Sequence, residues 1–237
     1  MKKIAKKGSD LYGASAVTIA FLGDSVTHGC FEIFEKAPGQ IETKFRREKA
    51  YSAILRALLA EICPAAAIHI INAGISGDSA PGGLSRIERD ILPFHPDLTV
   101  VCFGLNDNGH GAKGLDTYQN ALIEIYTKLK ESGSEVIALT PNMMNTYVSP
   151  HLATGAMTEI AAACALRQND GTMDAYMEAA REAARVCHVP VADVYAKWKA
   201  LFESGIDTTD LLSNYINHPT EEMHRLFAHE ILNTMLS

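Results

Sequence analysis

The sequence has 237 residues and lacks the cysteine pattern of a disulfide-stabilised or zinc-binding protein. Its cysteines are odd in number, and no two of them form a Cys-x-x-Cys pair. Three of them lie in apolar runs, where cysteine behaves as a small hydrophobic residue. We therefore expect reduced, buried thiols and a cytoplasmic protein. The five positions are Cys30, Cys63, Cys102, Cys164 and Cys187.

Positive charge is also scarce, since 21 Lys and Arg face 28 Asp and Glu, which gives a formal net charge of −7. A surface that neutralises nucleic-acid phosphates needs many more clustered cations. We expect no nucleic-acid partner, and the net charge also disfavours strongly anionic substrates.

Long hydrophobic runs are missing, because no stretch approaches the roughly 18 apolar residues that a membrane span needs. The apolar segment 14–22 follows the basic residues 1–7, as in a signal peptide. The polar residues 8–10 separate the two, however, and no small-residue cleavage site follows. We interpret 17–22 as a buried strand, expect no membrane insertion, and expect residues 1–14 to form a loosely ordered tail.

Cofactor and metal signatures are absent from the sequence as well. The glycine-rich segment 74–83 has neither Gly-x-Gly-x-x-Gly nor the Lys-Ser/Thr ending of a phosphate-binding loop. His224 and His229 lie five residues apart, so they do not share one helical face as metal ligands would. We expect no cofactor and no metal, and we expect both histidines at the surface.

Short apolar, β-branched runs alternate with longer helical patterns along the chain. Five such runs, each separated from the next by a helix, are typical of a parallel sheet buried on both faces. No linker divides the chain, so we expect one α/β domain over 1–237. Two connections, 27–47 and 141–156, are long enough to carry function. The expected strands are 17–22, 68–72, 98–103, 135–140 and 190–194, and the expected helices are 48–62, 84–92, 115–131, 171–187, 196–203 and 220–236.

Unusual polar groups follow three of the expected strands. They lie in 23–29, 72–79 and 104–107, and a fourth polar segment, 216–220, precedes the last helix. The carboxyl ends of strands in an open α/β sheet converge on one crevice. These segments supply a hydroxyl, an imidazole and several hydrogen-bond donors, which are the parts needed for acyl transfer.

Each of these residues also has a simpler explanation when it is taken alone. Ser25 follows turn chemistry that is common after strands. His218 precedes a proline, as at many helix entries, and Asn106 could satisfy a loop carbonyl. Gly77 could serve a positive φ angle. One shared cause explains all four positions better than four independent ones.

Together these motifs resemble the SGNH or GDSL hydrolase family. Its block Gly-Asp-Ser-x-x-x-Gly matches 23–29 and implies Ser25 as the nucleophile. Its block Asn-x-Gly-x-Ser-Gly ends at Gly77, and Gly-x-Asn-Asp contains Asn106. With the amide of Ser25, these two would form the oxyanion hole. A His-Pro before the last helix implies His218 as the general base.

The resemblance implies a three-layer α/β/α fold with a flavodoxin-like, five-stranded parallel sheet. It also implies a serine esterase that works by two-step acyl transfer. We expect a small-molecule ester, with a short acyl group on a soluble alcohol such as a carbohydrate, because no apolar lid is evident. Acyl-thioesterase or lysophospholipase-type activity stays an alternative.

One position departs from the family pattern. Tyr215 stands three residues before His218, where the family usually has an aspartate that orients the imidazole. Asp210, Asp193, the side chain of Asn214 or a main-chain carbonyl could take that role. The departure also leaves open a catalytically weak or inactive flavodoxin-like binding domain.

Several neighbouring residues have expected roles outside the chemical step. Asp24 and Asp107 should hold their loops through side-chain hydrogen bonds. His28 and His110 should be solvated loop residues, with substrate contact as the alternative. The segment 140–147 should border the crevice, and its two methionines, Met143 and Met144, either pack under the loop or contact substrate.

Overall fold

The computed structural model describes residues 1–37, 40–152 and 155–237, so parts of both long connections lie outside the described residues. All five expected strands form one parallel sheet in the order β4-β1-β5-β6-β7. This arrangement confirms the predicted α/β sheet. The strands are β1 (Val17–Gly23), β4 (Ile68–Gly74), β5 (Leu98–Cys102), β6 (Glu135–Thr140) and β7 (Val191–Asp193).

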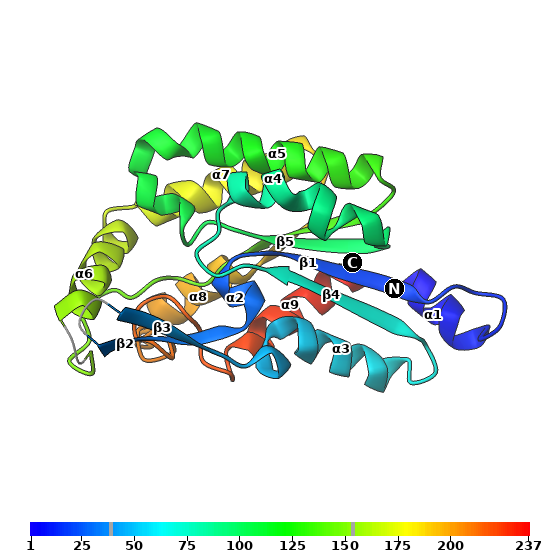
Figure 1. Ribbon diagram of the computed structural model, residues 1–237, viewed down its shortest axis with the longest axis horizontal. Helices are drawn as coiled ribbons and strands as arrows, with labels where there is room; N and C mark the ends of the chain where they lie inside the picture. Colours follow the sequence, from blue (N-terminus) through cyan, green and yellow to red (C-terminus); the bar gives the residue numbers. More distant parts are fainter. Residues whose placement is uncertain (38–39, 153–154) are drawn as a thin grey trace.

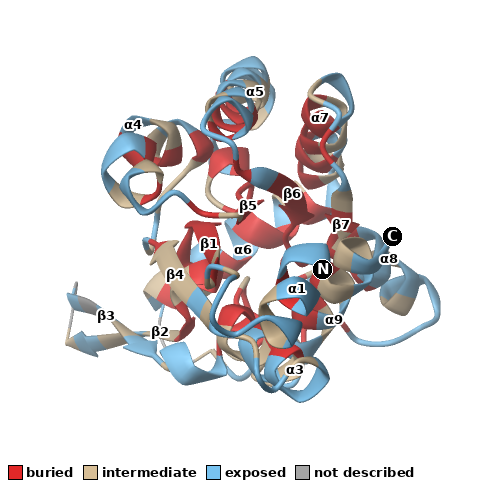
Figure 2. Cartoon of the chain, turned by 90° about the vertical axis from the view of Figure 1, so that its right-hand side faces the viewer, coloured by how far each residue is buried: buried red, intermediate tan, exposed pale blue. Residues whose placement is uncertain are grey.

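Helices cover both faces of the sheet, which confirms the predicted three-layer architecture (Figures 1 and 2). Both faces of the central strands are therefore buried, which explains why β1 and β5 read as continuous apolar runs. One face carries α4 (Ala80–Asp90), α5 (Leu115–Glu131) and α7 (Thr172–Val186), and the other carries α3 (Tyr51–Ile62), α8 (Val194–Glu203) and α9 (His224–Leu236).

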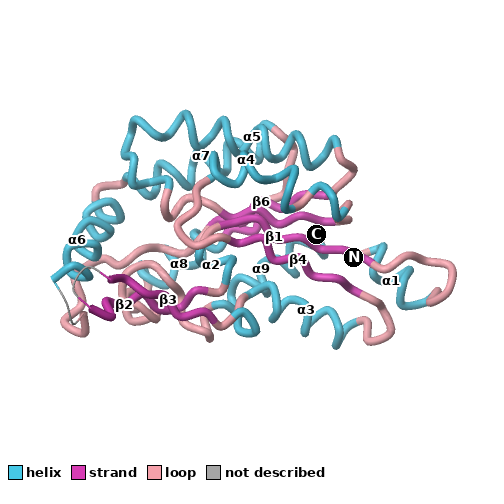
Figure 3. Tube along the Cα trace, in the orientation of Figure 1, coloured by secondary structure: helices cyan, strands magenta, loops and turns pink. Residues whose placement is uncertain are grey.

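The first long connection contains structure that the sequence did not predict. After the short helix α2 (Ser25–His28), an antiparallel hairpin pairs β2 (Cys30–Ala37) with β3 (Gln40–Phe45), apart from the main sheet (Figure 3). Cross-strand ion pairs such as Glu32–Lys44 support it. Its charged, half-exposed strands lack the apolar runs that identified the others. The 3₁₀ turn η1 (Arg47–Lys49) leads on to α3.

Two helices also lie outside the prediction. Residues 1–14 were expected as a loose tail, but α1 (Lys2–Ser9) forms there, because Ile4 is buried in the core and Lys3 bonds Asp97 at 2.8 Å. The helix α6 (Gly155–Asn169) follows the second long connection. Its buried residues are mostly small, so its helical periodicity is weak in the sequence.

The register of the strands sets the position of the candidate site. Gly23 at the end of β1 is aligned with Gly74 of β4 and with Cys102 of β5. A Cβ on Gly23 would collide with the side chain of Thr27, and one on Gly74 would collide with the main chain of His28. Both glycines thus allow α2 to pack directly on the strand ends. The segment η3 (Asp107–Gly114) follows the end of β5.

None of the described helices is both long and apolar enough to cross a membrane. All five cysteines are free, and three of them are buried while Cys63 and Cys187 are half-buried. A third 3₁₀ turn, η2 (Leu92–Phe94), connects α4 to β5.

Candidate active site

Ser25 and His218 lie in hydrogen-bond contact although 193 residues separate them. The distance from Ser25 Oγ to His218 Nε2 is 2.8 Å, which is the geometry that a nucleophile and its general base require. Ser25 is the first residue of α2, and Asp24 caps that helix by accepting the N–H of Val26. Both site side chains are nearly buried, with 4% and 1% of their surface exposed.

The loops that carry the other two expected oxyanion donors are tied to each other. Asn106 Nδ2 donates to the carbonyl of Asp78 at 2.8 Å, and Asp107 Oδ1 accepts the N–H of Ala80 at 2.8 Å. Gly77 has a φ of +79°, which glycine tolerates best. The space beside it is open, because a Cβ added there would meet no atom within 4 Å. The roles of Gly77 and Asn106 at an oxyanion stay predictions.

A buried arginine that the sequence analysis missed holds the same region. Arg86 on α4 donates to the carbonyl of Gly23 at 3.1 Å and to that of Ala73 at 2.6 Å. Its Nε pairs with Asp78 Oδ2 at 2.7 Å, and only 7% of the residue is exposed. The only signal in the sequence is one basic residue among the inward positions of the predicted helix 84–92.

The segment around His218 is held by uncharged groups. The side-chain oxygen of Asn214 accepts the N–H groups of Ile216, Asn217 and His218 at 3.1, 3.0 and 2.9 Å. Ser213 donates its N–H to the carbonyl of His218 at 2.8 Å and its hydroxyl to the carbonyl of Phe31. Asn214 therefore closes the turn and does not contact the imidazole.

The two carboxylates considered as orienting partners have other surroundings. Asp193 caps α8 and binds Arg181 and Thr140. Asp210 is exposed. Tyr215, at the usual aspartate position, has a φ of +54° and stacks on His151 with ring centroids 5.1 Å apart.

Burial dominates the electrostatics of His218. It lowers the pKa of His218 from 6.5 to about 4, while the main-chain carbonyl of Phe31 acts in the opposite direction and raises it. Among the described residues, Nδ1 makes no hydrogen bond of ordinary distance and angle. At neutral pH the imidazole is thus uncharged and able to accept a proton.

His224 was predicted at the surface, and this prediction is wrong. It is fully buried on α9, its Nδ1 accepts the N–H of Tyr51 at 3.1 Å, and its ring packs against Phe31 with centroids 4.7 Å apart. Burial lowers its pKa to about 3. The polarity of histidine suggested a surface position, but rings from β2, α3 and α9 surround this imidazole and bury it. His229 is exposed, as expected.

Asp24 and Asp107 hold their loops as predicted, through the N–H groups described above. Burial raises the pKa of Asp24 from 3.8 to about 7 and that of Asp107 to about 6. One oxygen of each carboxyl group has no hydrogen-bond partner within the described residues. The two acids are therefore costly to ionise, which suits a structural role.

The remaining candidates divide between loop packing and the rim of the site. Met143 and Met144 are buried under their loop, while Asn142 Nδ2 donates to the carbonyl of Asn217 at 2.9 Å and borders the His218 segment. The ring of His28 packs on Phe45 of the hairpin. His110 lines a cavity of about 380 Å³.

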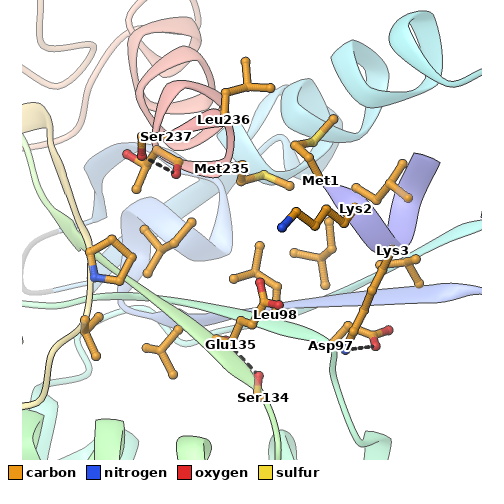
Figure 4. A pocket seen from close by; sticks show the side chains of 18 of the residues that line it. Met1, Lys2, Lys3, Asp97, Leu98, Ser134, Glu135, Met235, Leu236 and Ser237 are labelled. Carbon is orange, nitrogen blue, oxygen red and sulfur yellow. Dashed lines mark hydrogen bonds and ion pairs between the residues drawn. The ribbon is translucent and has the colours of Figure 1, made fainter. Parts of the chain in front are cut away.

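A pocket of about 730 Å³ lies away from these residues. It opens at the end of the sheet where the parallel strands begin, opposite the strand ends that carry Ser25. It lies between α1, the last turn of α9 and the first residues of β5 and β6. Figure 4 shows Lys3 and Asp97 paired at its wall. Neither Ser25 nor His218 lines it. Within the described ranges, no group of three or more His, Cys, Asp or Glu residues could hold a metal ion.

The chain is similar in sequence to known esterases and to a protein family. A model of the GDSL-like lipase/acylhydrolase family matches residues 21–226. Esterase TesA of Pseudomonas aeruginosa is 34% identical over 83 residues, which are 33% of this chain and 41% of that protein. An acetylxylan esterase of Geobacillus stearothermophilus is 26% identical over 136 residues, 54% of this chain and 60% of that protein. The matched regions thus span about half the length of these two relatives.

Solved structures show the same fold over nearly the whole chain. An acetylxylan esterase from Geobacillus stearothermophilus superposes with a TM-score of 0.66 and 20% identity, covering 93% of this chain and 94% of that one. A second acetyl xylan esterase gives a TM-score of 0.69 at 20% identity, covering 92% and 98%. At these identities the likeness establishes the fold.

Proposed function

We propose that this chain, which belongs to the GDSL-like lipase/acylhydrolase family, is a serine esterase with Ser25 as nucleophile and His218 as general base. The family resemblance expected from the sequence is confirmed. The single observation that carries the proposal is the 2.8 Å contact between Ser25 Oγ and His218 Nε2, formed by two motifs from opposite ends of the chain.

The reaction follows from this geometry in two steps. His218 Nε2 accepts the proton of Ser25 as Oγ attacks the ester carbonyl, and the oxyanion accepts hydrogen bonds from the amides of Ser25 and Gly77 and the side chain of Asn106. Collapse expels the alcohol, which takes the proton from Nε2. Water then attacks acyl-Ser25 with the same assistance, and the acid leaves with Ser25 restored.

The substrate that we propose has a short, acetyl-like acyl group on a soluble alcohol such as a carbohydrate. Its support is the name acetylxylan esterase, which recurs among the relatives and the structures of this fold. The alternative of an inactive binding domain is not favoured, because the serine and histidine keep a productive distance. The single-domain organisation, the cytoplasmic location and the absence of a nucleic-acid partner stay predictions.

Covalent labelling tests the proposal directly. Purified protein should react with a fluorophosphonate probe and hydrolyse p-nitrophenyl acetate. Ser25→Ala should lose both, whereas Ser9→Ala, at the exposed end of α1, should retain both. A folded wild-type protein that neither labels nor turns over would refute the serine-esterase proposal.

The acyl preference has its own test. In a series of p-nitrophenyl esters from acetyl to decanoyl, kcat/KM should be highest for acetyl and should fall with chain length. Acetylated xylooligosaccharides should release acetate at a measurable rate. If kcat/KM instead rises towards decanoyl, the esterase assignment stands and the short-acyl assignment is wrong.

A further inference from the structure

The base of the proposed esterase lacks the carboxylate that normally orients such a histidine. We propose that uncharged groups position His218 instead: its buried Nδ1–H, which makes no hydrogen bond of ordinary distance and angle among the described residues, uses the main-chain carbonyl of Phe31 as its acceptor during catalysis, and Ser213 fixes that carbonyl against the histidine segment. This inference rests on the proposed function and adds Ser213 as a positioning residue.

The first line of evidence is the surroundings of the acids near His218. Asp193 is engaged by Arg181 at 2.8 Å and by the N-terminus of α8. Asp210 is exposed. The position that usually carries the acid holds Tyr215, whose ring stacks on His151. The carboxylates named by the sequence analysis therefore have other partners or face solvent.

The second line of evidence is the direction of the imidazole. Because Nε2 contacts Ser25 Oγ and must accept its proton, the neutral ring carries its hydrogen on Nδ1. Nδ1 is buried and has no hydrogen-bond partner of ordinary geometry within the described residues, so its hydrogen needs an acceptor. Ser213 holds the carbonyl of Phe31 in β2 beside the main chain of His218, and this carbonyl raises the pKa of His218, against the larger effect of burial. A carbonyl in that place selects the same tautomer that an aspartate would select.

Ser213 connects this carbonyl to the histidine segment. Its hydroxyl donates to the carbonyl of Phe31, while its N–H donates to the carbonyl of His218. One residue thus bonds both the general base and the strand that orients it. The side chain of Asn214, with three accepted N–H groups, closes the rest of the turn.

The hairpin is fixed independently at its base, so Phe31 is a stable reference point. The N–H of Arg46 donates to the carbonyl of Gly29 at 2.8 Å, and the Arg46 side chain pairs with Glu221, three residues beyond His218. The Phe31 ring packs on His224. The hairpin therefore joins the nucleophile segment to the segment of its base.

A neutral partner stabilises the imidazolium less than a carboxylate does. The charged groups nearby do not replace it. His224 is neutral because burial lowers its pKa to about 3, and Glu221 is paired with Arg46 and Lys49. We therefore expect the acidic limb of kcat/KM to lie well below pH 6.5, close to the value of about 4 for His218.

The experiment compares Ser213→Ala with Ser213→Thr on p-nitrophenyl acetate. Losing one positioning hydrogen bond should lower kcat about 3- to 10-fold, with KM nearly unchanged. Ser213→Thr should restore at least half of the wild-type kcat, since it keeps the hydroxyl. Asp210→Asn should leave kcat and KM unchanged.

The wild-type pH profile gives a second readout that needs no variant, so misfolding of Ser213→Ala would not hide the answer. An apparent pKa below about 5.5 in kcat/KM supports neutral positioning, because a buried imidazole without a carboxylate partner has a lowered pKa. An apparent pKa at or above 6.5, or a loss of 100-fold or more in Asp210→Asn, overturns it. A protein that labels and turns over yet shows either result keeps its esterase function and loses only this inference.

Discussion

The two sides of the candidate site are built from different chemistry. On the oxyanion side, buried acidic and basic groups gather: Arg86 pairs with Asp78, and the charges of Asp107 and Asp78 add to the cost of ionising the buried Asp24. On the histidine side, hydroxyl and amide groups such as those of Ser213 and Asn214 make the contacts.

This difference matches what each side does during acyl transfer. Negative charge develops at the oxyanion, so loops held by a buried ion pair keep their donors in place while the charge appears. The base must begin the reaction uncharged. Burial keeps His218 in that state, since it lowers the pKa of the imidazole to about 4. The contrast also predicts opposite pH dependences of stability for the two sides.

The largest effect is expected when the ion pair on the oxyanion side is removed. Arg86→Met leaves Asp78 nearly buried without its cation and frees two strand-end carbonyls, so the free energy of unfolding should fall by about 3–5 kcal/mol in urea denaturation. Arg89→Met, on the exposed side of the same helix, should leave it nearly unchanged, because exposed ion pairs contribute little. Equal effects in the two variants would contradict the structural role of Arg86.

Next in size, Asn106→Ala removes one donor from the oxyanion side. We expect kcat for p-nitrophenyl acetate to fall by about 10²–10³, with labelling of Ser25 still detectable but slow. The hydrogen bond to the Asp78 carbonyl is also lost, so thermal unfolding should be measured in parallel. A kcat within about threefold of the wild type would remove Asn106 from the oxyanion hole.

A smaller effect concerns stability at high pH. The pKa of Asp24 is about 7 in the folded protein and 3.8 ordinarily, so the folded state binds more protons between these values. Stability is therefore lost as pH rises through this interval, by about 2–3 kcal/mol between pH 5 and 8. Asp24→Asn keeps the acceptor for Val26 and should flatten this slope in urea titrations. If the fall in stability with rising pH is the same in Asp24→Asn, a group other than Asp24 causes it.

On the histidine side, stability should depend on pH in the opposite direction, and the expected change is the smallest of the four. The pKa of His224 is about 3 in the folded protein and 6.5 ordinarily, so the unfolded state binds more protons and stability falls as pH drops below 6.5. Because His218 titrates in the same direction, His224→Phe should remove only part of the loss, about 1–3 kcal/mol at pH 4.5. His229→Phe, at an exposed site, is the matched control.

The sequence predicted the strands and the site motifs because both have local signals. The strand ends place Ser25, Gly77 and Asn106 by short-range turn chemistry, and the Ser25–His218 contact agrees with the family motif. The roles of Gly77 and Asn106 in catalysis stay predictions. Helix 115–131 coincides with α5, since its apolar face is strongly periodic.

What the sequence could not predict depends on long-range contacts. His224 is buried because Phe31 and Tyr51, distant in the chain, meet on it. Arg86 reads as an ordinary helical cation until three strand-end groups converge on it. The hairpin is stabilised by cross-strand charge pairs and leaves little apolar pattern. Its carbonyl at Phe31 is a main-chain group, which no side-chain motif reports.

The separation of Ser25 from His218 has a consequence for the newly made chain. A ribosome adds about 5–20 residues per second, so the nucleophile leaves the exit tunnel about 10–40 s before the histidine 193 residues later. During that time the serine hydroxyl has no base and stays as inert as any other. If Ser25 and His218 have the proposed roles, reactivity towards esters therefore begins only when the segment that carries His218 has been synthesised and has docked.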